Sequence, residues 1–599
     1  MVSDPEKELG SRSIEQPFEE NSERQPGPAI PSDSIAAVDH TVTSLQIANE
    51  NDTAGPSAHP STTASITKSK FKTATIVAAL YLTLFIAALD QMIVATAIPT
   101  ITHELHSARG YTWIGGAYLI ANAAGGPIWA KLSDIWGRKP ILLAAVSWFL
   151  FASIICARAG SMRVLIGGRA LQGASAGGCL QLVTITISDM FSLRSRSLYL
   201  GGLGFMWAIA GGIGPVLGGA LAQYASWRWI FWINLPTFGI TFVVLSVFLD
   251  VHNPRTNVIA GIKAIDWLGS LSILAVVIML LLGLNFGGET FPWSSPKVIC
   301  LLIFGFLATF IFLFTERKIA RYPLMPAALF RNKSNIATLI VTACHGCVYI
   351  GSEYYLPLYF QSTHAATPTQ SGLLILPTML MSAVMGIVCG IVMHRYSAYR
   401  GLIIVGSVLM TVGTGLYIMF DAETSIAMII GLQFIAGTGA GLLFEPVYIA
   451  IQAFTGQENV ATASSTLSFT RNMATSLGVV IGGVVFQNSM TSQSGCLAAT
   501  GLPPAILSKL SGQDAAANVD IVAMIADVQA RLVVQKAFAS STRNMWIFYT
   551  CVGTICVLAS FFIKASRLSE EHVETKTGLL TTEKKAGEME LQNVDGIAV

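Results

Sequence analysis

The stretch Lys131-Leu132-Ser133-Asp134-Ile135-Trp136-Gly137-Arg138-Lys139-Pro140 lies between two long apolar segments. It holds one acid and three bases in a turn that is too short to form a domain. Asp134 and Arg138 are four residues apart, so on a helical turn their side chains can pair. The pattern predicts a tight basic turn between two membrane-length helices.

The composition of the whole chain points to a lipid environment. Of its 599 residues, 53% are hydrophobic and only 12% are charged, against about 25% charged in an average soluble domain. The net charge of +2 shows no clustered basic surface, which argues against nucleic acid as a partner. We therefore predict a polytopic membrane protein that has the lipid bilayer as its surroundings.

A helical crossing needs about 20 mostly apolar residues, and we count fourteen such runs. The first covers Thr73–Pro99, the second Tyr111–Ala130 and the last Met545–Ile563. The polar stretch Asn488–Arg543 is too charged to cross lipid and is predicted as an outer loop with some amphipathic helix. The predicted fold class is an all-α membrane protein with 14 transmembrane helices.

Two polar tails frame these runs. Residues 1–70 and 564–599 lack apolar periodicity and are predicted to be disordered. Most Lys and Arg residues of the short loops lie in one set of alternate loops, which includes the Lys131–Pro140 turn. By the positive-inside rule, that turn and both termini are predicted to be cytosolic.

The chain also repeats itself. Ile166–Gly177 aligns without gaps to Ile430–Gly441, and Lys131–Gly137 aligns more weakly to Ile391–Ser397. Related halves with a site between them are common in secondary transporters. The predicted domains are the tail 1–70, a six-helix half 71–250, two inserted spans with a linker 251–333, a second six-helix half 334–563 with the outer loop 488–543, and the tail 564–599.

In this order, the motifs resemble the fourteen-span drug:proton antiporter branch of the major facilitator superfamily, particularly its fungal efflux pumps. The segments that carry the resemblance are Leu89–Pro99, Lys131–Pro140, Arg169–Gly173, Gly201 with Gly214–Gly219, Trp227–Pro236, Asp266–Ser270 and Tyr354–Gln361. Ala130, Ile135, Met92 and Ala210 depart from the family pattern but stay small or apolar, so they cast little doubt on the fold.

The resemblance implies proton-coupled efflux of hydrophobic small molecules such as drugs, toxins or secondary metabolites. It further implies two pseudo-repeats plus two inserted helices, a plasma-membrane or possibly vacuolar location, a monomer, and no cofactor besides the proton gradient. A proton-coupled uptake permease for siderophores or amino acids is the main alternative. A receptor or an intramembrane enzyme fits less well, since the chain has a two-half repeat and no catalytic cluster.

The turn is implied to act as a gate on the cytosolic side. In the family pattern it latches one half against the other in the outward-facing state. The gate residues are Lys131, Asp134, Gly137, Arg138 and Lys139. The alternative is that the bases only anchor the topology.

The fifth apolar run carries a glycine-rich motif that the resemblance associates with antiporters. Its members are Gly201, Gly211, Gly214, Pro215, Gly218 and Gly219. The glycines leave one helix face bare, so another helix can approach closely, and the proline removes a backbone donor and bends the helix. Ordinary glycine-mediated packing is the alternative reading.

Ionisable groups within the spans cost at least about 2.5–3.5 kcal/mol each and are candidate functional sites. Asp90 and Arg169 lie at similar depth, so we expect Asp90 to take part in proton coupling, with Arg169 and Gln172 tuning it; a static structural pair is the alternative. Glu353 is predicted as a second proton or cationic-substrate site. Glu445 and Arg471 are predicted to be structural, and His345 is the only mid-span imidazole.

A substrate path is expected at the midplane between the halves. Its candidate lining residues are Asn122, Trp207, Tyr349, Tyr355, Gln361 and Gln433. Cys344 and Cys347 have the spacing of half a zinc site, but no second pair completes it, so no metal site is predicted. The sequence has no phosphate-binding loop of the G-x-x-x-x-G-K-[ST] type, which argues against an ATP-driven pump.

Overall fold

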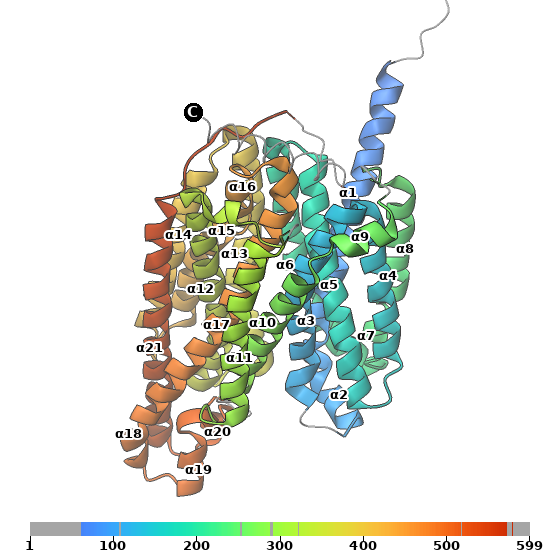
Figure 1. Ribbon diagram of the computed structural model, residues 1–599. Helices are drawn as coiled ribbons and strands as arrows, with labels where there is room; N and C mark the ends of the chain where they lie inside the picture. The colour runs from blue at the N-terminus through green and yellow to red at the C-terminus, as the bar shows by residue number, and fades with distance from the viewer. Residues whose placement is uncertain are drawn as a thin grey trace, which may run out of the picture. The chain divides into compact units, whose positions relative to one another are not determined.

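The computed structural model shows a bundle of long helices (Figure 1). The structure describes residues 62–106, 110–251, 254, 256–287, 291–320, 323–516, 518–571 and 578. Within these ranges it has no β-strand, only an isolated bridge between Gly287 and Phe291. The predicted all-α class is therefore confirmed.

The helices follow the order of the predicted runs. The first half comprises α1 (Thr62–Ile93), α2 (Ile98–Glu104), α3 (Gly110–Trp136), α4 (Arg138–Ala157), α5 (Met162–Met190), α6 (Leu193–Tyr224), α7 (Trp229–Trp232) and α8 (Asn234–Phe248). Next come α9 (Val258–Ala264), α10 (Trp267–Phe286) and α11 (Pro296–Lys318). The rest comprises α12 (Lys333–His364), α13 (Pro368–Tyr396), α14 (Tyr399–Leu416), α15 (Ile426–Phe444), α16 (Pro446–Gln452), α17 (Val460–Ser492), α18 (Ser494–Ala498), α19 (Pro504–Lys509), α20 (Asp520–Met524) and α21 (Val528–Ser560).

Twelve helical segments among the described residues are long and apolar enough to span a bilayer, where the sequence predicted fourteen. Helices α3 and α21 occupy the places of the second and last predicted spans but do not have the composition of a spanning segment. Glycines and Asn122 dilute the apolar content of α3, and α21 begins with a polar stretch that includes Arg531 and Lys536.

Two predicted boundaries are wrong. Helix α1 begins at Thr62, inside the predicted tail, because Thr62–Lys70 holds no Gly or Pro and extending a formed helix costs little. The predicted outer loop 488–543 is shorter, since α17 continues to Ser492 and α21 starts at Val528. The side chains of Val534 and Phe538 pack into a separate apolar core with Phe486, and this packing extends the helices. The remaining tail residues, 1–61, 572–577 and 579–599, lie outside the described ones.

The repeat is visible in helix contacts. A Cβ atom added to Gly173 of α5 would collide with the backbone of Tyr118 in α3, and one added to Gly437 of α15 would meet the carbonyl oxygen of Thr378 in α13 at 2.5 Å. Gly173 and Gly437 are equivalent in the sequence alignment. The same close packing therefore joins α3 to α5 and α13 to α15.

Hydrogen bonds between the two halves join helices at the end of the bundle where α3 meets α4, which we call the Arg138 end. Arg196 Nη1 of α6 donates to Gln452 Oε1 of α16 at 2.8 Å, and Gln452 Nε2 donates to Ser188 Oγ of α5 at 3.2 Å. The guanidinium of Arg194 donates to two carbonyl oxygens at the end of α13, at 2.5 and 3.0 Å. This end lies at the top of Figure 1.

The segment after α21 also contacts both halves at the Arg138 end. Tyr399 Oη of α14 donates to the carbonyl of Lys564 at 2.8 Å. Arg194 of α6 pairs with Glu570. Residues 564–571 thus bridge α14 and α6.

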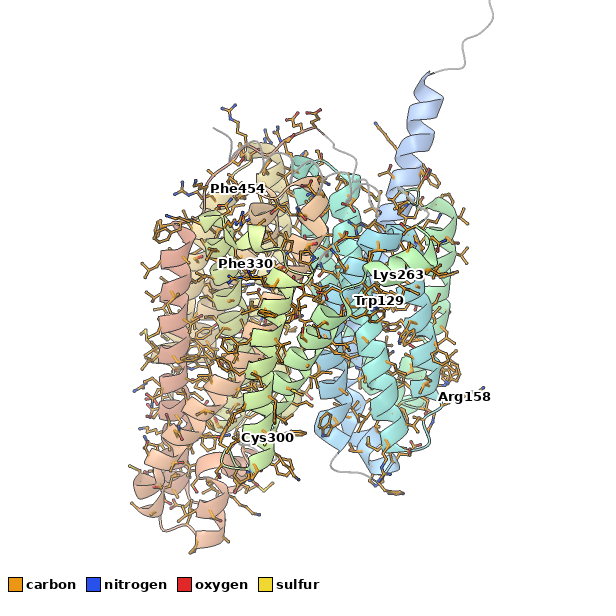
Figure 2. All side chains as sticks on the ribbon, viewed as in Figure 1. Trp129, Arg158, Lys263, Cys300, Phe330 and Phe454 are labelled. Atoms are coloured by element: carbon orange, nitrogen blue, oxygen red, sulfur yellow. The ribbon has the colours of Figure 1, made fainter. Side chains whose placement is uncertain are left out.

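The inserted helices α10 and α11 pack against each other, and α10 also contacts α3 and α17. Apolar side chains form this contact: Ile120 and Ala124 of α3, Val277 of α10 and Phe469 of α17 belong to one core cluster. In Figure 2, side chains fill the spaces between the helices, with Cys300 of α11 near the end opposite the Arg138 end.

Candidate functional site

Asp90 of α1 forms a buried ion pair with Arg169 of α5, with Arg169 Nη1 at 2.6 Å from Asp90 Oδ2. The other carboxylate oxygen accepts hydrogen bonds from Gln172 Nε2 at 2.8 Å and Asn234 Nδ2 at 2.7 Å. Gln172 Oε1 accepts from Arg169 Nη1 at 2.7 Å, and Gln172 Nε2 also donates to Ser153 Oγ at 3.0 Å. We call these five residues the Asp90 cluster.

The cluster is sealed from solvent, since Asp90 is 0% and Arg169 1% exposed. The guanidinium of Arg169 lies over the Tyr118 ring, 4.2 Å from its centroid, and its Nε donates to the carbonyl of Ile114 at 3.3 Å. The Tyr118 hydroxyl in turn donates to the carbonyl of Ala87 at 3.1 Å. Each charge therefore has several partners, which a buried ion pair needs to offset its desolvation.

The short sequence spacing explains part of this geometry. Arg169 and Gln172 are three residues apart on α5 and share one helix face. Asn234 begins α8, directly after the short helix α7, and this break points its amide at α1.

Our site prediction missed Asn234, Ser153 and Tyr118. A signal was available for Asn234, because it is an uncompensated amide within an apolar run. Ser153 gave no such signal, since a serine hydroxyl within a helix commonly bonds to its own backbone. For Tyr118, the sequence does not show that its ring lies under the Arg169 guanidinium.

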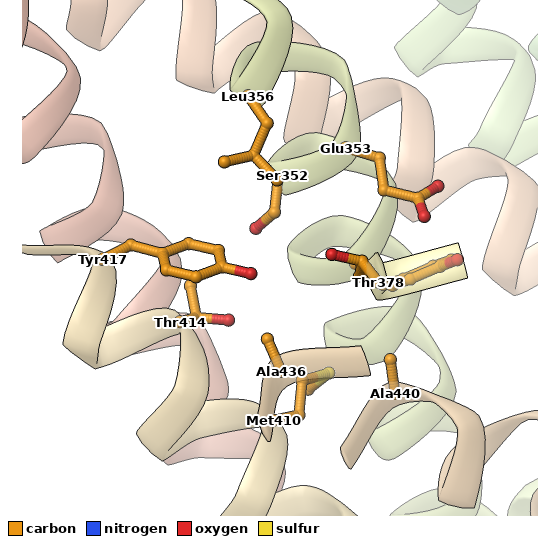
Figure 3. A pocket seen from close by; sticks show the side chains of 10 residues that line it. Ser352, Glu353, Leu356, Thr378, Met410, Thr414, Tyr417, Ala436 and Ala440 are labelled. Atoms are coloured by element: carbon orange, nitrogen blue, oxygen red, sulfur yellow. The ribbon is translucent and has the colours of Figure 1, made fainter. Parts of the chain in front are cut away.

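Glu353 lies in the other half and does not join the Asp90 cluster. It borders a small cavity of about 10 Å³ between α12, α13, α14 and α15. In Figure 3, the hydroxyl groups of Ser352, Thr378 and Tyr417 point toward the middle of this cavity. Glu353 Oε1 and Ser352 Oγ are buried, and neither has a hydrogen-bond partner among the residues that the structure describes.

The predicted lining residues separate into two groups. Tyr349 lines the Glu353 cavity, and Gln433 accepts a hydrogen bond from Thr378 of that cavity at 2.8 Å. Tyr355 and Gln361 instead form hydrogen bonds between helices. Tyr355 Oη donates to the carbonyl of Val479 at 2.6 Å, and Gln361 Nε2 donates to Ser371 Oγ at 3.0 Å.

The other two predicted lining residues lie in the first half. Trp207 of α6 packs against the cluster of Ala88, Leu89 and Ala210. The backbone of Asn122 in α3 packs closely on Gly177 of α5. The structure therefore does not gather the six predicted lining residues around one cavity.

The turn of Lys131–Pro140 consists of a single residue between two helices. Gly137 has φ 93°, in the region that favours glycine, and α4 begins at the next residue. Arg138 Nη1 lies 2.5 Å from Asp134 Oδ1, and Arg138 Nε lies 2.7 Å from Asp189 Oδ2 of α5. Arg138 Nη1 also donates to Ser133 Oγ at 2.7 Å.

The latch stays a prediction, and in this conformation the contacts of Arg138 lie within one half. The named partners of Arg138 all belong to the first half, so its ion pairs hold α3, α4 and α5 together rather than one half against the other. Lys131 Nζ donates to the carbonyl of Pro323, in the linker after α11, at 3.2 Å. Lys139 is half-buried beside the start of α4. Hydrogen bonds that cross between the halves include those of Arg194, Arg196 and Gln452.

The glycines of the α6 motif lie in three environments: against α1, against α13 and beside open space. A Cβ atom on Gly218 would collide with the carbonyl of Ile93, and one on Gly214 would lie 2.9 Å from Met92 Cβ, so both glycines admit α1. A Cβ atom on Gly201 would lie 2.9 Å from the carbonyl of Gly386 in α13, across the boundary between the halves. A Cβ atom on Gly211 or Gly219 would meet nothing within 4 Å. Helix α6 continues through Pro215, whose side chain lies outside the described ones.

A bundle of membrane-length helices built from two related halves is typical of secondary transporters. Residues 80–479 match the family model described as Major Facilitator Superfamily. The chain is 41% identical over 512 residues to the "MFS-type transporter ppz2" of Metarhizium majus, covering 86% of this chain and 88% of that protein. It is likewise 41% identical over 513 residues to the "Efflux pump dotC" of Dothistroma septosporum, with the same coverage of 86% and 88%.

The chain is also similar to more distant relatives and to solved structures. The "Efflux pump FUS6" of Gibberella moniliformis is 33% identical over 524 residues, covering 87% of this chain and 92% of that protein. The fold is also that of the human organic anion transporter MFSD10, with a TM-score of 0.53, 14% identity and coverage of 82% and 99%. The proton:xylose symporter XylE aligns with a TM-score of 0.51 at 13% identity, covering 86% and 98%. The chain belongs to the Major Facilitator Superfamily and is a transporter rather than an enzyme.

Proposed function

We propose that this transporter exports hydrophobic or amphipathic small molecules, such as drugs, toxins or fungal secondary metabolites, and that protons drive the export. Export is supported by relatives whose names include "efflux pump". The competing function is proton-coupled uptake by a permease of the same superfamily. The close packing of α6 on α1 through Gly214 and Gly218 favours export, because this motif is the one that resembles antiporters.

The observation that carries the proton coupling is the sealed Asp90 cluster. An ion pair with 0% and 1% exposure in an apolar helix bundle is costly to bury, which favours a functional role over a static structural pair. We infer that Asp90 exchanges between Arg169 and a proton as the halves move, with Gln172 and Asn234 holding the carboxylate in place. Glu353 is the second carboxyl that we assign to coupling.

The contacts at the Arg138 end suggest how access alternates. In this conformation, Arg194, Arg196 and Gln452 join the halves there. We infer that this end is cytosolic, that these contacts close the cytosolic side, and that the ion pairs of Arg138 keep α3, α4 and α5 rigid during opening.

We further propose fourteen crossings, with α3 and α21 as the two beyond the twelve apolar segments. Helix α3 packs closely on α5 through Gly173, so other helices can cover its polar atoms in the bilayer. Both termini are then cytosolic, and the location is the plasma membrane or, alternatively, the vacuolar membrane. We propose a monomer that needs only substrate, protons and lipid, with no cofactor and no nucleic-acid partner.

Dye accumulation in cells tests the direction and the driving force. Cells with the transporter should accumulate less of a membrane-permeant rhodamine dye than cells without it, and a protonophore should remove the difference. Asp90→Asn should abolish the difference when the accumulation is normalised to the amount of transporter at the cell surface. Glu423→Gln is the matched carboxyl-to-amide control, because Glu423 is an exposed residue paired at 3.6 Å with Lys536. Higher accumulation with the transporter would mean uptake, and efflux that resists the protonophore would refute proton coupling.

Thiol labelling tests the orientation. Cys496 is exposed in α18, at the end opposite Arg138. An impermeant maleimide should label Cys496 from outside intact cells, and should label a cysteine at Lys139 only after permeabilisation. Cys496→Ser provides the background for both measurements. The reverse pattern would refute the proposed orientation.

A further inference from the structure

The chain leaves α21 after Ser560 and continues across the Arg138 end as irregular backbone. We call residues 561–571 the C-terminal strap. In Figure 1, the red trace that follows α21 runs over the top of the bundle. Because α21 packs against α12, α14 and α17, the strap is covalently joined to the second half. The contacts of its far end decide whether it stays within that half.

Three hydrogen bonds fix the start of the strap on the second half. Tyr399 Oη of α14 donates to the carbonyl of Lys564 at 2.8 Å, and the backbone N–H of Lys564 donates to Ser334 Oγ of α12 at 3.1 Å. Arg400 Nη2 of α14 donates to the carbonyl of Phe561 at 3.4 Å. The strap therefore begins as a fixed part of the second half.

The far end of the strap is bound by the first half. Arg194, at the start of α6, donates its backbone N–H to the carbonyl of Ser569 at 3.2 Å, and its guanidinium forms an ion pair with Glu570. The next described residue, Gly578, donates its backbone N–H to the carbonyl of Asp134 of α3 at 3.0 Å. The strap therefore crosses the boundary between the halves.

Arg194 links the strap to the contacts that close this end. Its guanidinium also donates to the carbonyls of His394 and Arg395 at the end of α13. Leu568 is 5% exposed and belongs to the main apolar core, so burial anchors the middle of the strap. The ion pair is more accessible, with side-chain exposures of 29% for Arg194 and 73% for Glu570. Water and salt weaken such a pair, which makes this contact reversible.

We propose that the C-terminal strap restrains the opening of the Arg138 end, so that the halves separate there only after Glu570 has left Arg194. The inference rests on the proposed function, because it adds a regulatory element to the alternating access described there. Separating the halves must break the contacts of the strap with α6 in addition to the hydrogen bonds of Arg196 and Gln452. A tail that only covered the second half would make no bond to α6.

Thiol labelling at position 197 measures this opening in the full-length chain. Ser197 of α6 is 0% exposed, and its Oγ donates to the carbonyl of Gly390 of α13 at 3.4 Å, across the boundary. In lipid nanodiscs, Ser197→Cys should react with a maleimide as the boundary opens. Peptide mass spectrometry distinguishes this site from the native cysteines, so the labelling rate reports the opening alone.

Variants of the strap, made in the Ser197→Cys chain, test the proposal. Glu570→Arg should raise the labelling rate about two- to fivefold, because an exposed ion pair is lost. Adding Leu568→Ala should raise it about tenfold or more, because the apolar anchor is weakened as well. Glu571→Arg is the matched control, since Glu571 is the neighbouring exposed glutamate and the ion pair with Arg194 belongs to Glu570. An unchanged rate in the double variant would overturn the proposal.

A native cysteine separates opening from unfolding. Cys179 of α5 is 0% exposed within the core, so it should label no faster in any of these variants. A parallel rise at Cys179 would show that the variants loosen the whole fold, and it would overturn the proposed role of the strap.

Salt provides a second measurement. Raising the salt concentration from about 0.1 M to about 1 M should speed labelling of the chain with an intact strap about twofold, because salt screens the exposed ion pair. The same change should not speed labelling of Glu570→Arg, which lacks the pair. A salt effect of equal size in both chains would refute the role of Glu570.

Labelling needs no transported compound and no proton gradient, so the two proposals can fail separately. Wild-type labelling in the double variant, together with dye efflux that a protonophore abolishes, would remove the strap and leave proton-coupled export standing. Faster labelling of Glu570→Arg together with protonophore-resistant efflux would refute the proton coupling and keep the strap.

Discussion

Gln452 Nε2 donates to Ser188 Oγ at 3.2 Å across the boundary between the halves, and the two residues are 264 positions apart. The same offset relates Ile166 to Ile430 in the sequence repeat. The contact therefore joins two equivalent positions and lies near the axis that relates the halves. Because Gln452 also accepts from Arg196, this one side chain holds two first-half helices against the second half.

Locking this boundary should stop transport. With cysteines at Arg194 and Arg395, whose side chain and carbonyl lie 3.0 Å apart, a reducible thiol cross-linker should abolish dye efflux and a reductant should restore it. Each single cysteine variant, treated in the same way, is the control. Full efflux from the cross-linked protein would show that the halves do not separate at this end.

Breaking the Asp90 pair should cost stability as well as coupling. Asp90→Asn leaves Arg169 buried without its counter-charge, which should lower the free energy of unfolding by about 3–5 kcal/mol. Removing both charges with Asp90→Asn and Arg169→Gln should recover much of this loss without restoring proton-dependent efflux. Thermal unfolding in nanodiscs measures the first effect. A double variant that is less stable than Asp90→Asn alone would contradict the expectation.

The glycines of α6 should differ sharply in how well they tolerate replacement by alanine. Gly218→Ala would drive a methyl group into the carbonyl of Ile93, so we expect little folded protein in fluorescence size-exclusion chromatography. Gly211→Ala meets open space and should be neutral or stabilising by up to about 1 kcal/mol, because alanine is the better helix former. Equal yields from the two variants would argue against the close packing of α6 on α1.

Arg138 should matter more than its neighbour Lys139. Arg138→Ala leaves Asp134 and the buried Asp189 without their shared cation, at a cost of about 3–5 kcal/mol. Lys139→Ala should change stability by no more than about 0.5 kcal/mol. Thermal melts of both variants give the comparison, and similar melting temperatures would show that the ion pairs contribute little.

A weak pH dependence should arise at the end opposite Arg138. The hydrogen bond from Arg228, 2.5 Å from Glu104, holds the pKa of Glu104 below its ordinary value. The pair therefore stabilises the fold above the ordinary pKa of about 4.3, and this contribution disappears as the pH falls below the lowered pKa. Because both side chains are partly exposed, Glu104→Gln should cost no more than about 1 kcal/mol at neutral pH. The melting temperatures of wild type and variant should converge in acid.

The sequence located most of the helices because apolar runs of membrane length carry a strong signal. It missed the start of α1, where polar residues continue a formed helix, and the start of α21, where Val534 and Phe538 pack into an apolar core. Asp90 and Arg169 could be predicted as a pair from their depth alone. Asn234 stands out in the sequence as an amide within an apolar run, but its partner does not, because the contact with Asp90 joins residues 144 positions apart and depends on how α8 leaves α7. The contacts of Gln452 with the first half could not be predicted for the same reason, since no local pattern in the sequence shows which helix ends meet.

The inserted helix α10 has a mechanical consequence. It contacts α3 of one half and α17 of the other through the aliphatic and aromatic surfaces of Ile120, Val277 and Phe469. Contacts of this kind have no preferred direction, so they persist when the surfaces slide. The bonds around Gln452 are directional and break within a small displacement. The insert can thus keep the two halves aligned as they slide past each other, while the hydrogen bonds around Gln452 break and form again.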